Sequence, residues 1–141
     1  MKRSILIFLC AILLLSCKKD NNNGPDAIRI FTRGPVNLGG TGSTYMLKGT
    51  IVKEGGVEIA ECGFIYTQNG TQNNNFPDYN NPTNTLRINI PLNKNTPPVN
   101  FETSALLVSG QFYYIAAYVR VYNSKTGQDD IITGPYVLLK T

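Results

Sequence analysis

The sequence predicts an all-β chain in which seven strands form two sheets packed face to face. From Asp26 onward, no segment repeats apolar residues with the 3.6-residue period of a helix. Short runs rich in β-branched and aromatic residues instead recur between clusters of Gly, Pro and Asn. Two packed sheets bury seven such runs, and a domain of about 115 residues covers enough of its surface to be stable without a disulfide.

The first three predicted strands span residues 27–33, 44–53 and 58–67. Side chains alternate between the two faces of a strand. The second strand therefore places on one face Tyr45, Leu47, Gly49 and Ile51. The third strand places on one face Cys62, Phe64 and Tyr66. Gly55 and Gly56 lie between these strands and favour a turn, because glycine adopts positive φ without a steric penalty.

The other four predicted strands span residues 85–90, 99–107, 111–122 and 130–140. Gly134-Pro135 interrupts the last of them and indicates a sheet edge or a bulge, since proline has no N–H for a central ladder. Strand 111–122 is the longest, and its alternation assigns to the core Tyr113, Ile115, Ala117, Val119 and Val121.

The N-terminus has the layout of an export signal. Lys2 and Arg3 precede an unbroken apolar run over residues 5–15, which is shorter than the roughly 20 residues of a membrane span. The run ends in Leu14-Leu15-Ser16-Cys17, which resembles a bacterial lipobox. This resemblance implies that residues 1–16 are removed and that Cys17 carries lipid. The alternative is an ordinary signal peptide with an incidental cysteine.

Residues 17–26 form the expected link between anchor and domain. The segment after Cys17 contains two lysines, one aspartate and three asparagines, and it ends in Gly-Pro. This polar composition predicts a flexible tether. This layout resembles lipoproteins of Bacteroidetes-type bacteria, and it implies an outer-membrane location with the membrane contacted through the lipid. Which face of that membrane carries the domain stays open.

One stretch resembles a known family. Leu107 precedes Tyr113 by six residues, and alternating apolar residues follow, as at the E–F corner and F strand of fibronectin type III domains. Gly110 and the pairs Tyr113-Tyr114 and Ala117-Tyr118 are similar to a variant found in Bacteroidetes surface proteins. The resemblance covers residues 27–141. It implies a seven-stranded immunoglobulin-like β-sandwich in which the Tyr113 hydroxyl bonds to nearby backbone.

The chain departs from that family at one core position. It has no tryptophan, and Gly49 stands about where the usual core tryptophan would be. We therefore expect Tyr45 or Phe64 to fill that volume.

Composition argues against catalysis and against nucleic acid as a partner. The chain has no histidine, which removes the commonest general base and most zinc sites. Cys62 is expected to be a buried small hydrophobe. Without residues 1–16, the formal charge falls from +4 by the two cations Lys2 and Arg3 to +2, and no basic cluster remains to follow a phosphate backbone. We expect no enzyme activity and no cofactor.

Two regions could bind a ligand. The outward face of strand 111–122 carries Phe112, Tyr114, Ala116, Tyr118, Arg120 and Tyr122. Of these, Tyr114, Tyr118, Arg120 and Tyr122 would suit a sugar ring or a protein partner. Phe76 and Tyr79 lie among amide side chains in a polar loop over residues 68–84. For the strand, the alternative is cross-strand pairing of the aromatic residues that only stabilises the sheet. For the loop, the alternative is a mobile surface insertion.

The carboxylates predict no metal site. Glu58 and Glu61 lie three residues apart on one strand and face opposite sides, and Asp129-Asp130 is expected in a solvated turn. The remaining function is a non-catalytic binding module for glycans or envelope proteins. The alternative is a structural or assembly subunit of an outer-membrane complex or surface fibre, built by pairing of strand edges.

Overall fold

The computed structural model describes residues 28–39, 43–53, 58–69, 75–91 and 100–141. The expected signal peptide, lipidated Cys17 and tether lie outside these residues. The described residues form eight strands and no helix: β1 (Ile28–Asn37), β2 (Thr44–Lys53), β3 (Ile59–Asn69), β4 (Leu86–Ile90), β5 (Asn100–Leu106), β6 (Phe112–Asn123), β7 (Gln128–Thr133) and β8 (Val137–Lys140). In this part of the chain, no helix has the length and apolarity needed to cross a membrane.

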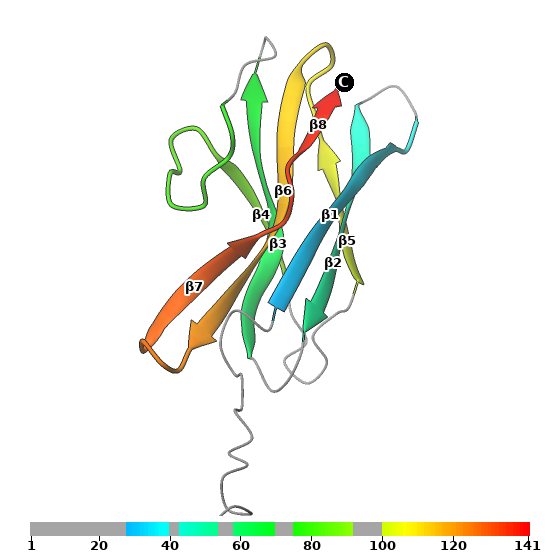
Figure 1. Cartoon of the computed structure of the whole chain (residues 1–141). Coiled ribbons are helices and arrows are strands. Elements are labelled where there is room, and N and C mark those ends of the chain that lie inside the picture. Colours follow the sequence, from blue (N-terminus) through cyan, green and yellow to red (C-terminus); the bar gives the residue numbers. More distant parts are fainter. Residues whose placement is uncertain (1–27, 40–42, 54–57, 70–74, 92–99) are drawn as a thin grey trace, which may run out of the picture.

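The strands form two antiparallel sheets in a sandwich-like arrangement (Figure 1). The three-stranded sheet has the order β1-β2-β5, and the five-stranded sheet has the order β4-β3-β6-β7, with β8 also paired to β6. The all-β prediction and the two packed sheets are therefore confirmed.

The last predicted strand is in fact two strands, β7 and β8, which pair with different halves of β6. The break lies at Gly134, as the glycine and proline there suggested. The Gly134 N–H donates to the Ala117 carbonyl at 2.8 Å, while the Ala117 N–H donates to Thr32 Oγ1 of β1 at 2.9 Å. A side chain at position 134 would lie 2.9 Å from the same hydroxyl. The close approach of β1 thus requires glycine at the break.

The predicted turn at Asp129 and Asp130 is wrong, because both residues belong to β7. The turn lies before them, over residues 124–127, and its last residue, Gly127, has a φ of 70°. The Asp130 carboxylate accepts a hydrogen bond from the Asn123 side chain at 2.7 Å across that turn.

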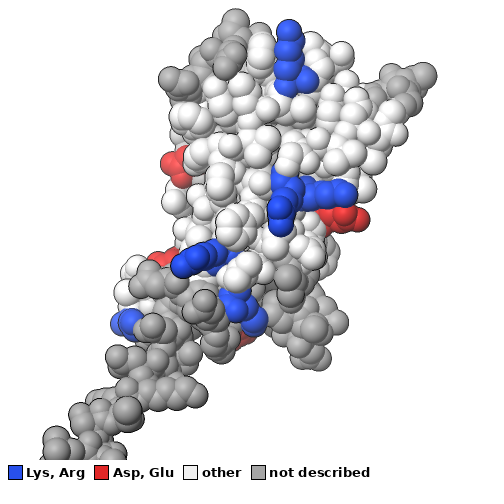
Figure 2. Space-filling view, turned by 45° about the vertical axis from the view of Figure 1, so that its right-hand side comes forward, with Lys and Arg blue, Asp and Glu red and all other residues white. Residues whose placement is uncertain are grey.

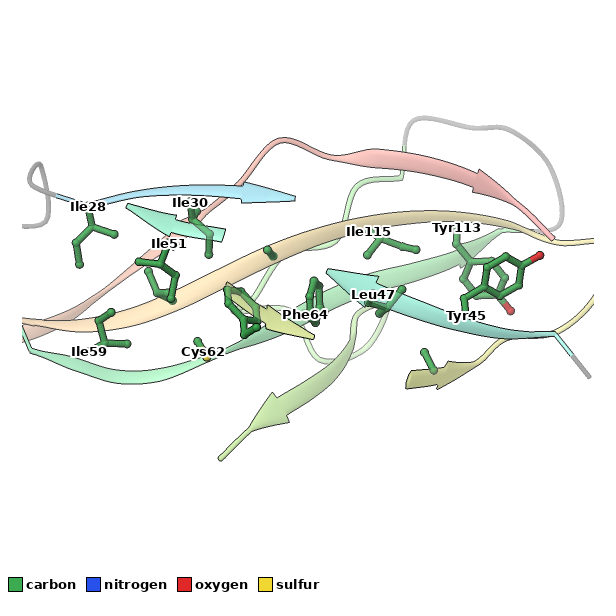
Figure 3. Packing of buried hydrophobic residues seen from close by; sticks show 14 of the residues in the cluster. Ile28, Ile30, Tyr45, Leu47, Ile51, Ile59, Cys62, Phe64, Tyr113 and Ile115 are labelled. Atoms are coloured by element: carbon green, nitrogen blue, oxygen red, sulfur yellow. The ribbon is translucent and has the colours of Figure 1, made fainter. Parts of the chain in front are cut away.

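The core lies between the sheets and follows the predicted alternation (Figure 3). All five residues assigned to the core face of β6 are buried, as are Leu47 and Ile51 of β2 and Cys62 and Phe64 of β3. Alternation along each strand was therefore enough to identify the inward side chains.

The space beside Gly49 is filled by Phe101, which the sequence analysis did not name. A Cβ on Gly49 would lie 2.3 Å from the Phe101 ring. Phe64 packs against that ring with a centroid distance of 5.2 Å, so Phe64 contributes to the filling as expected. Tyr45 does not, because it lies at the other end of the core (Figure 3).

Tyr113 makes the hydrogen bond that the family resemblance implies. The Val108 N–H donates to its hydroxyl oxygen at 2.8 Å, and the Tyr113 ring is buried. Leu107, just before this corner, is also buried, and its N–H donates to the Ser43 carbonyl. The corner thus ties the segment between β5 and β6 to the core.

Candidate functional site

Residues 75–85 cover part of the outer face of the five-stranded sheet. Tyr114 and Tyr118 lie on that face of β6, but they are only 7% and 0% exposed. Phe76 packs on Tyr114 at a centroid distance of 4.8 Å, and Tyr79 packs on Tyr118 at 5.0 Å. The prediction that these two tyrosines form an exposed platform is therefore wrong. They instead support the segment above them.

Short polar side chains shape this segment locally. The Asp78 carboxylate accepts the Asn80 N–H at 3.0 Å, and the Asn81 side-chain oxygen accepts the Thr83 N–H at 3.2 Å. Asp and Asn favour such turns because their side chains reach the backbone two residues later. The Asp78 N–H donates to Thr85 Oγ1 at 2.9 Å, and this hydrogen bond joins the start of the segment to its end. In its described part, the polar loop packs on the sheet and is joined by hydrogen bonds within itself.

Glu61 fastens this cover to the sheet. One oxygen of its carboxylate accepts hydrogen bonds from the hydroxyls of Tyr118 at 2.5 Å and Tyr79 at 3.4 Å. The other oxygen accepts Arg120 Nε at 3.2 Å, and Arg120 Nη1 reaches Asp129 at 2.5 Å. Glu61 faces Arg120 directly because β3 and β6 pair in that register.

The same contacts shift two pKa values. Burial, and then the hydrogen bond to Glu61, raise the pKa of the Tyr118 phenol far above its ordinary range. The hydrogen bond to Asp129, together with Glu61, raises the pKa of Arg120. Because Arg120 is paired with two carboxylates, it is not the free cation that the sequence suggested beside the tyrosines.

Arg87 adds a second cation to the cover. Its guanidinium carbon lies 4.8 Å from the centre of the Tyr79 ring, a distance typical of a cation–π contact. Tyr79 is thus held on three sides, by Arg87, Tyr118 and Glu61.

A recess of about 200 Å³ opens between this cover and β7. Tyr136 forms one wall, and its hydroxyl donates to the Pro77 carbonyl at 3.2 Å. The lining residues are Pro77, Asp78, Tyr79, Asn80, Ile131, Thr133 and Tyr136. The recess therefore combines two tyrosine rings with a carboxylate and an amide.

Of the residues that sequence analysis proposed, only Tyr79 lines this recess. Phe76 lies beside it, packed on Tyr136 at 4.9 Å and half exposed. Tyr122 is exposed, but like Arg120 it lies outside the lining. Tyr136 was not predicted from the sequence, where its only signal is its position directly after the Gly-Pro break.

Cys62 is the one cysteine among the described residues, and it is not paired in a disulfide. The Cys62 side chain is fully buried, and burial followed by the nearby Glu61 charge raises the pKa of its thiol to about 11. A raised pKa keeps a thiol protonated and weakly nucleophilic. Among the residues that the structure describes, no group of three His, Cys, Asp or Glu side chains could hold a metal ion.

Comparisons of the chain with protein-family models, with curated proteins and with solved structures found no match. The class of protein is thus described by its fold and its recess. It is a two-sheet β-sandwich with a small aromatic and polar recess on one outer face.

Proposed function

We propose that this chain is a lipid-anchored, non-catalytic lipoprotein that presents a β-sandwich binding module for glycans at the outer membrane. The observation that carries the proposal is the recess in which Tyr79 and Tyr136 flank Asp78 and Asn80.

The chemistry of the recess suits a sugar. Tyrosine rings offer an apolar face with a polar edge, which matches the CH and OH groups of a pyranose. The Asp78 carboxylate accepts hydrogen bonds from hydroxyls, and the Asn80 amide both donates and accepts them. At about 200 Å³, the recess is smaller than the roughly 300–1,000 Å³ of pockets for drug-sized molecules. This size favours one or two sugar rings of a longer chain.

Two observations support a fibronectin type III-like assignment of the fold. The sheets have the strand orders β1-β2-β5 and β4-β3-β6-β7, so each sheet contains strands from both halves of the chain. The second observation is the hydrogen bond between the Val108 N–H and the Tyr113 hydroxyl.

A binding role is also supported by the surroundings of the Glu61 carboxylate and of the Cys62 thiol. Glu61 is occupied by two tyrosine hydroxyls and one guanidinium, and the Cys62 thiol is buried with a raised pKa. Neither group is available as a base or a nucleophile.

The binding site is tested by screening the detergent-purified, full-length protein against uncharged oligosaccharides of glucose, galactose and mannose. We expect at least one of them to raise the melting temperature. Tyr136→Ala and Asp78→Asn should weaken its binding severalfold, whereas Tyr122→Ala, at an exposed tyrosine outside the recess, should not. Equal binding by all variants would contradict the assigned site.

The alternative is a structural or assembly subunit. It would be favoured if no glycan raises the melting temperature and one fixed membrane protein co-purifies with the chain.

The anchor is tested separately by labelling cells with radioactive palmitate. The wild-type protein should take up label, and Cys17→Ser should not. Label that persists in Cys17→Ser would overturn the assignment of the lipid to Cys17.

A further inference from the structure

The outer face of the three-stranded sheet has a larger hollow than the recess. It measures about 610 Å³ and is lined by Arg33, Lys48, Gly49, Asn100, Phe101 and Glu102. Figure 2 shows this side of the molecule, turned toward the viewer, with Lys and Arg side chains standing on a mostly uncharged surface.

Strand pairing explains the shape of the hollow. Arg33, Lys48 and Glu102 lie opposite one another across β1, β2 and β5. A second row, two residues along each strand, consists of Phe31, Thr50 and Asn100. The hollow lies over the backbone of Gly49 and Phe101, because the side-chain positions of those two residues face the core. The whole first row lines it, and of the second row Asn100 does.

A chain of hydrogen bonds orients the donors around the hollow. Arg33 Nε donates to Thr50 Oγ1 at 3.3 Å, and Thr50 Oγ1 donates to the side-chain oxygen of Asn100 at 3.0 Å. These bonds leave the terminal nitrogens of Arg33 and the amide nitrogen of Asn100 without a partner among the described residues. Both side chains are exposed.

The charges around the hollow favour an anion. Lys48 Nζ lies 3.9 Å from Glu102, with side-chain exposures of 45% and 60%, so this pair is loose and solvated. The lining holds two cations, Arg33 and Lys48, and one anion, Glu102, which leaves a net charge of +1. The fork of a guanidinium matches the two oxygens of a carboxylate.

An aromatic ring stands beside these charges. Phe31 is 42% exposed and lies on the same face of β1 as Arg33, two residues away. An exposed ring next to a cation can cover the apolar face of a sugar whose carboxylate meets that cation.

We propose that this hollow is a second binding site, on the opposite sheet from the recess, and that it takes an acidic saccharide of the hexuronate type. The sugar carboxylate pairs with Arg33 and Lys48, the hydroxyls bond to Asn100 and Glu102, and the ring packs on Phe31. An acidic peptide is disfavoured because an extended peptide binds a sheet best by pairing with its edge. This hollow instead crosses β2, the middle strand of its sheet.

The test is calorimetric titration of the full-length protein in detergent with galacturonic acid oligomers, with galactose oligomers of the same length and with a polyglutamate peptide. We expect the galacturonic acid oligomers to bind through Arg33 and polyglutamate not to bind, while any binding of galactose oligomers belongs to the recess and is unaffected by Arg33→Gln. Arg33→Gln should weaken that binding by about tenfold or more, since a hydrogen bond to a charged group contributes about 1.5–3 kcal/mol. Asn100→Ala should weaken it severalfold.

Lys125→Gln is the matched control, because it removes one exposed cation from the turn between β6 and β7. It should leave the affinity unchanged, and so should Tyr136→Ala, which alters only the recess. The melting temperature of each variant shows that it is folded. Equal weakening by Lys125→Gln, tighter binding of polyglutamate, or no binding of galacturonic acid oligomers by the wild type would each overturn the proposal. Loss in Arg33→Gln with retention in Tyr136→Ala would support it whether or not the recess binds neutral sugars.

Discussion

At the scale of single residues, Glu61 is the most heavily used polar side chain on the covered face. Its carboxylate is 12% exposed and receives hydrogen bonds from Tyr118, Tyr79 and Arg120. A charged acceptor in a partly buried site strengthens each of these bonds. One carboxylate therefore holds both the sheet and the segment that lies on it.

Glu61→Gln should reduce the free energy of unfolding by about 1–3 kcal/mol, because the charge-assisted bond to buried Tyr118 becomes a neutral one. Little of that loss comes from Arg120, which is partly exposed and keeps Asp129. Glu102→Gln is the control, since its ion pair with Lys48 is exposed, and it should change stability by less than about 0.5 kcal/mol. Urea unfolding measures both variants, and equal effects would contradict the role assigned to Glu61.

Gly49 is the residue where steric reasoning gives the sharpest expectation. Gly49→Ala places a methyl group 2.3 Å from the Phe101 ring and should cost about 1–3 kcal/mol by overpacking. Gly34→Ala is the matched control, because a Cβ there meets nothing within 4 Å. In the double variant with Phe101→Leu, the Gly49→Ala change should cost less than it does alone. Thermal unfolding of the wild type, of Gly49→Ala, of Phe101→Leu and of the double variant tests this, and strict additivity would show that the ring is not the obstacle.

Cys62 allows a prediction about pH. Its thiol has a folded-state pKa of about 11, above the ordinary value of 9.0, so the folded protein favours the protonated form. This contribution to stability is complete below pH 9 and is lost as pH rises through 11. In a Cys17→Ser background without residues 1–16, we expect Cys62 to react with a disulfide reagent at pH 8 only after denaturant is added. Rapid reaction of the native protein would show that the thiol is accessible.

At the scale of elements, the junction of β7 and β8 depends on β1. The Ala117 N–H has Thr32 Oγ1 as its acceptor, at the point on β6 between the residues that pair with β7 and those that pair with β8. Thr32→Val keeps the shape but leaves this buried N–H without a partner, which should cost about 1–3 kcal/mol. Thr32→Ser retains the hydroxyl and should recover most of the loss. Chemical unfolding checks both variants, and similar destabilisation by Ser and Val would mean that the methyl group, not the bond, matters.

The elements also show what the sequence could and could not predict. Alternation is a property of one strand, so the inward residues of β2, β3 and β6 followed from the chain itself. The partners of Glu61 did not, because they depend on the register between β3 and β6. The same holds for Phe101, which meets Gly49 only after β2 and β5 pair.

The candidate site was predicted less well than the strands for a related reason. Outward residues on a strand are exposed only if nothing folds over them, and the segment at residues 75–85 does so at Tyr114 and Tyr118. Aromatic content pointed to the sheet on which the recess lies and to Tyr79, which lines it. The recess itself arises from a loop, a strand and the β7–β8 junction, which are far apart in the chain.

At the scale of the whole molecule, the two hollows lie on opposite outer faces of the sandwich. The recess opens on the five-stranded sheet and the basic hollow on the three-stranded sheet. Because the core separates them, substitutions at one should leave binding at the other unchanged. A single saccharide chain that carries both neutral and acidic sugars would have to pass around an edge of the sandwich to occupy both.

The contact between Thr32 and Ala117 has a mechanical consequence. If the domain hangs from lipid at Cys17, a pull on a bound glycan is transmitted to the membrane through the start of β1 at Ile28. Among the described strands, β1 forms ladder hydrogen bonds only with β2, so within its own sheet the load would pass through that ladder. The hydroxyl of Thr32, set into the gap between β7 and β8, gives the load a second route, directly into β6 and the sheet that bears the recess. The break in the last strand thus makes room for a direct link between β1 and the sheet that bears the recess.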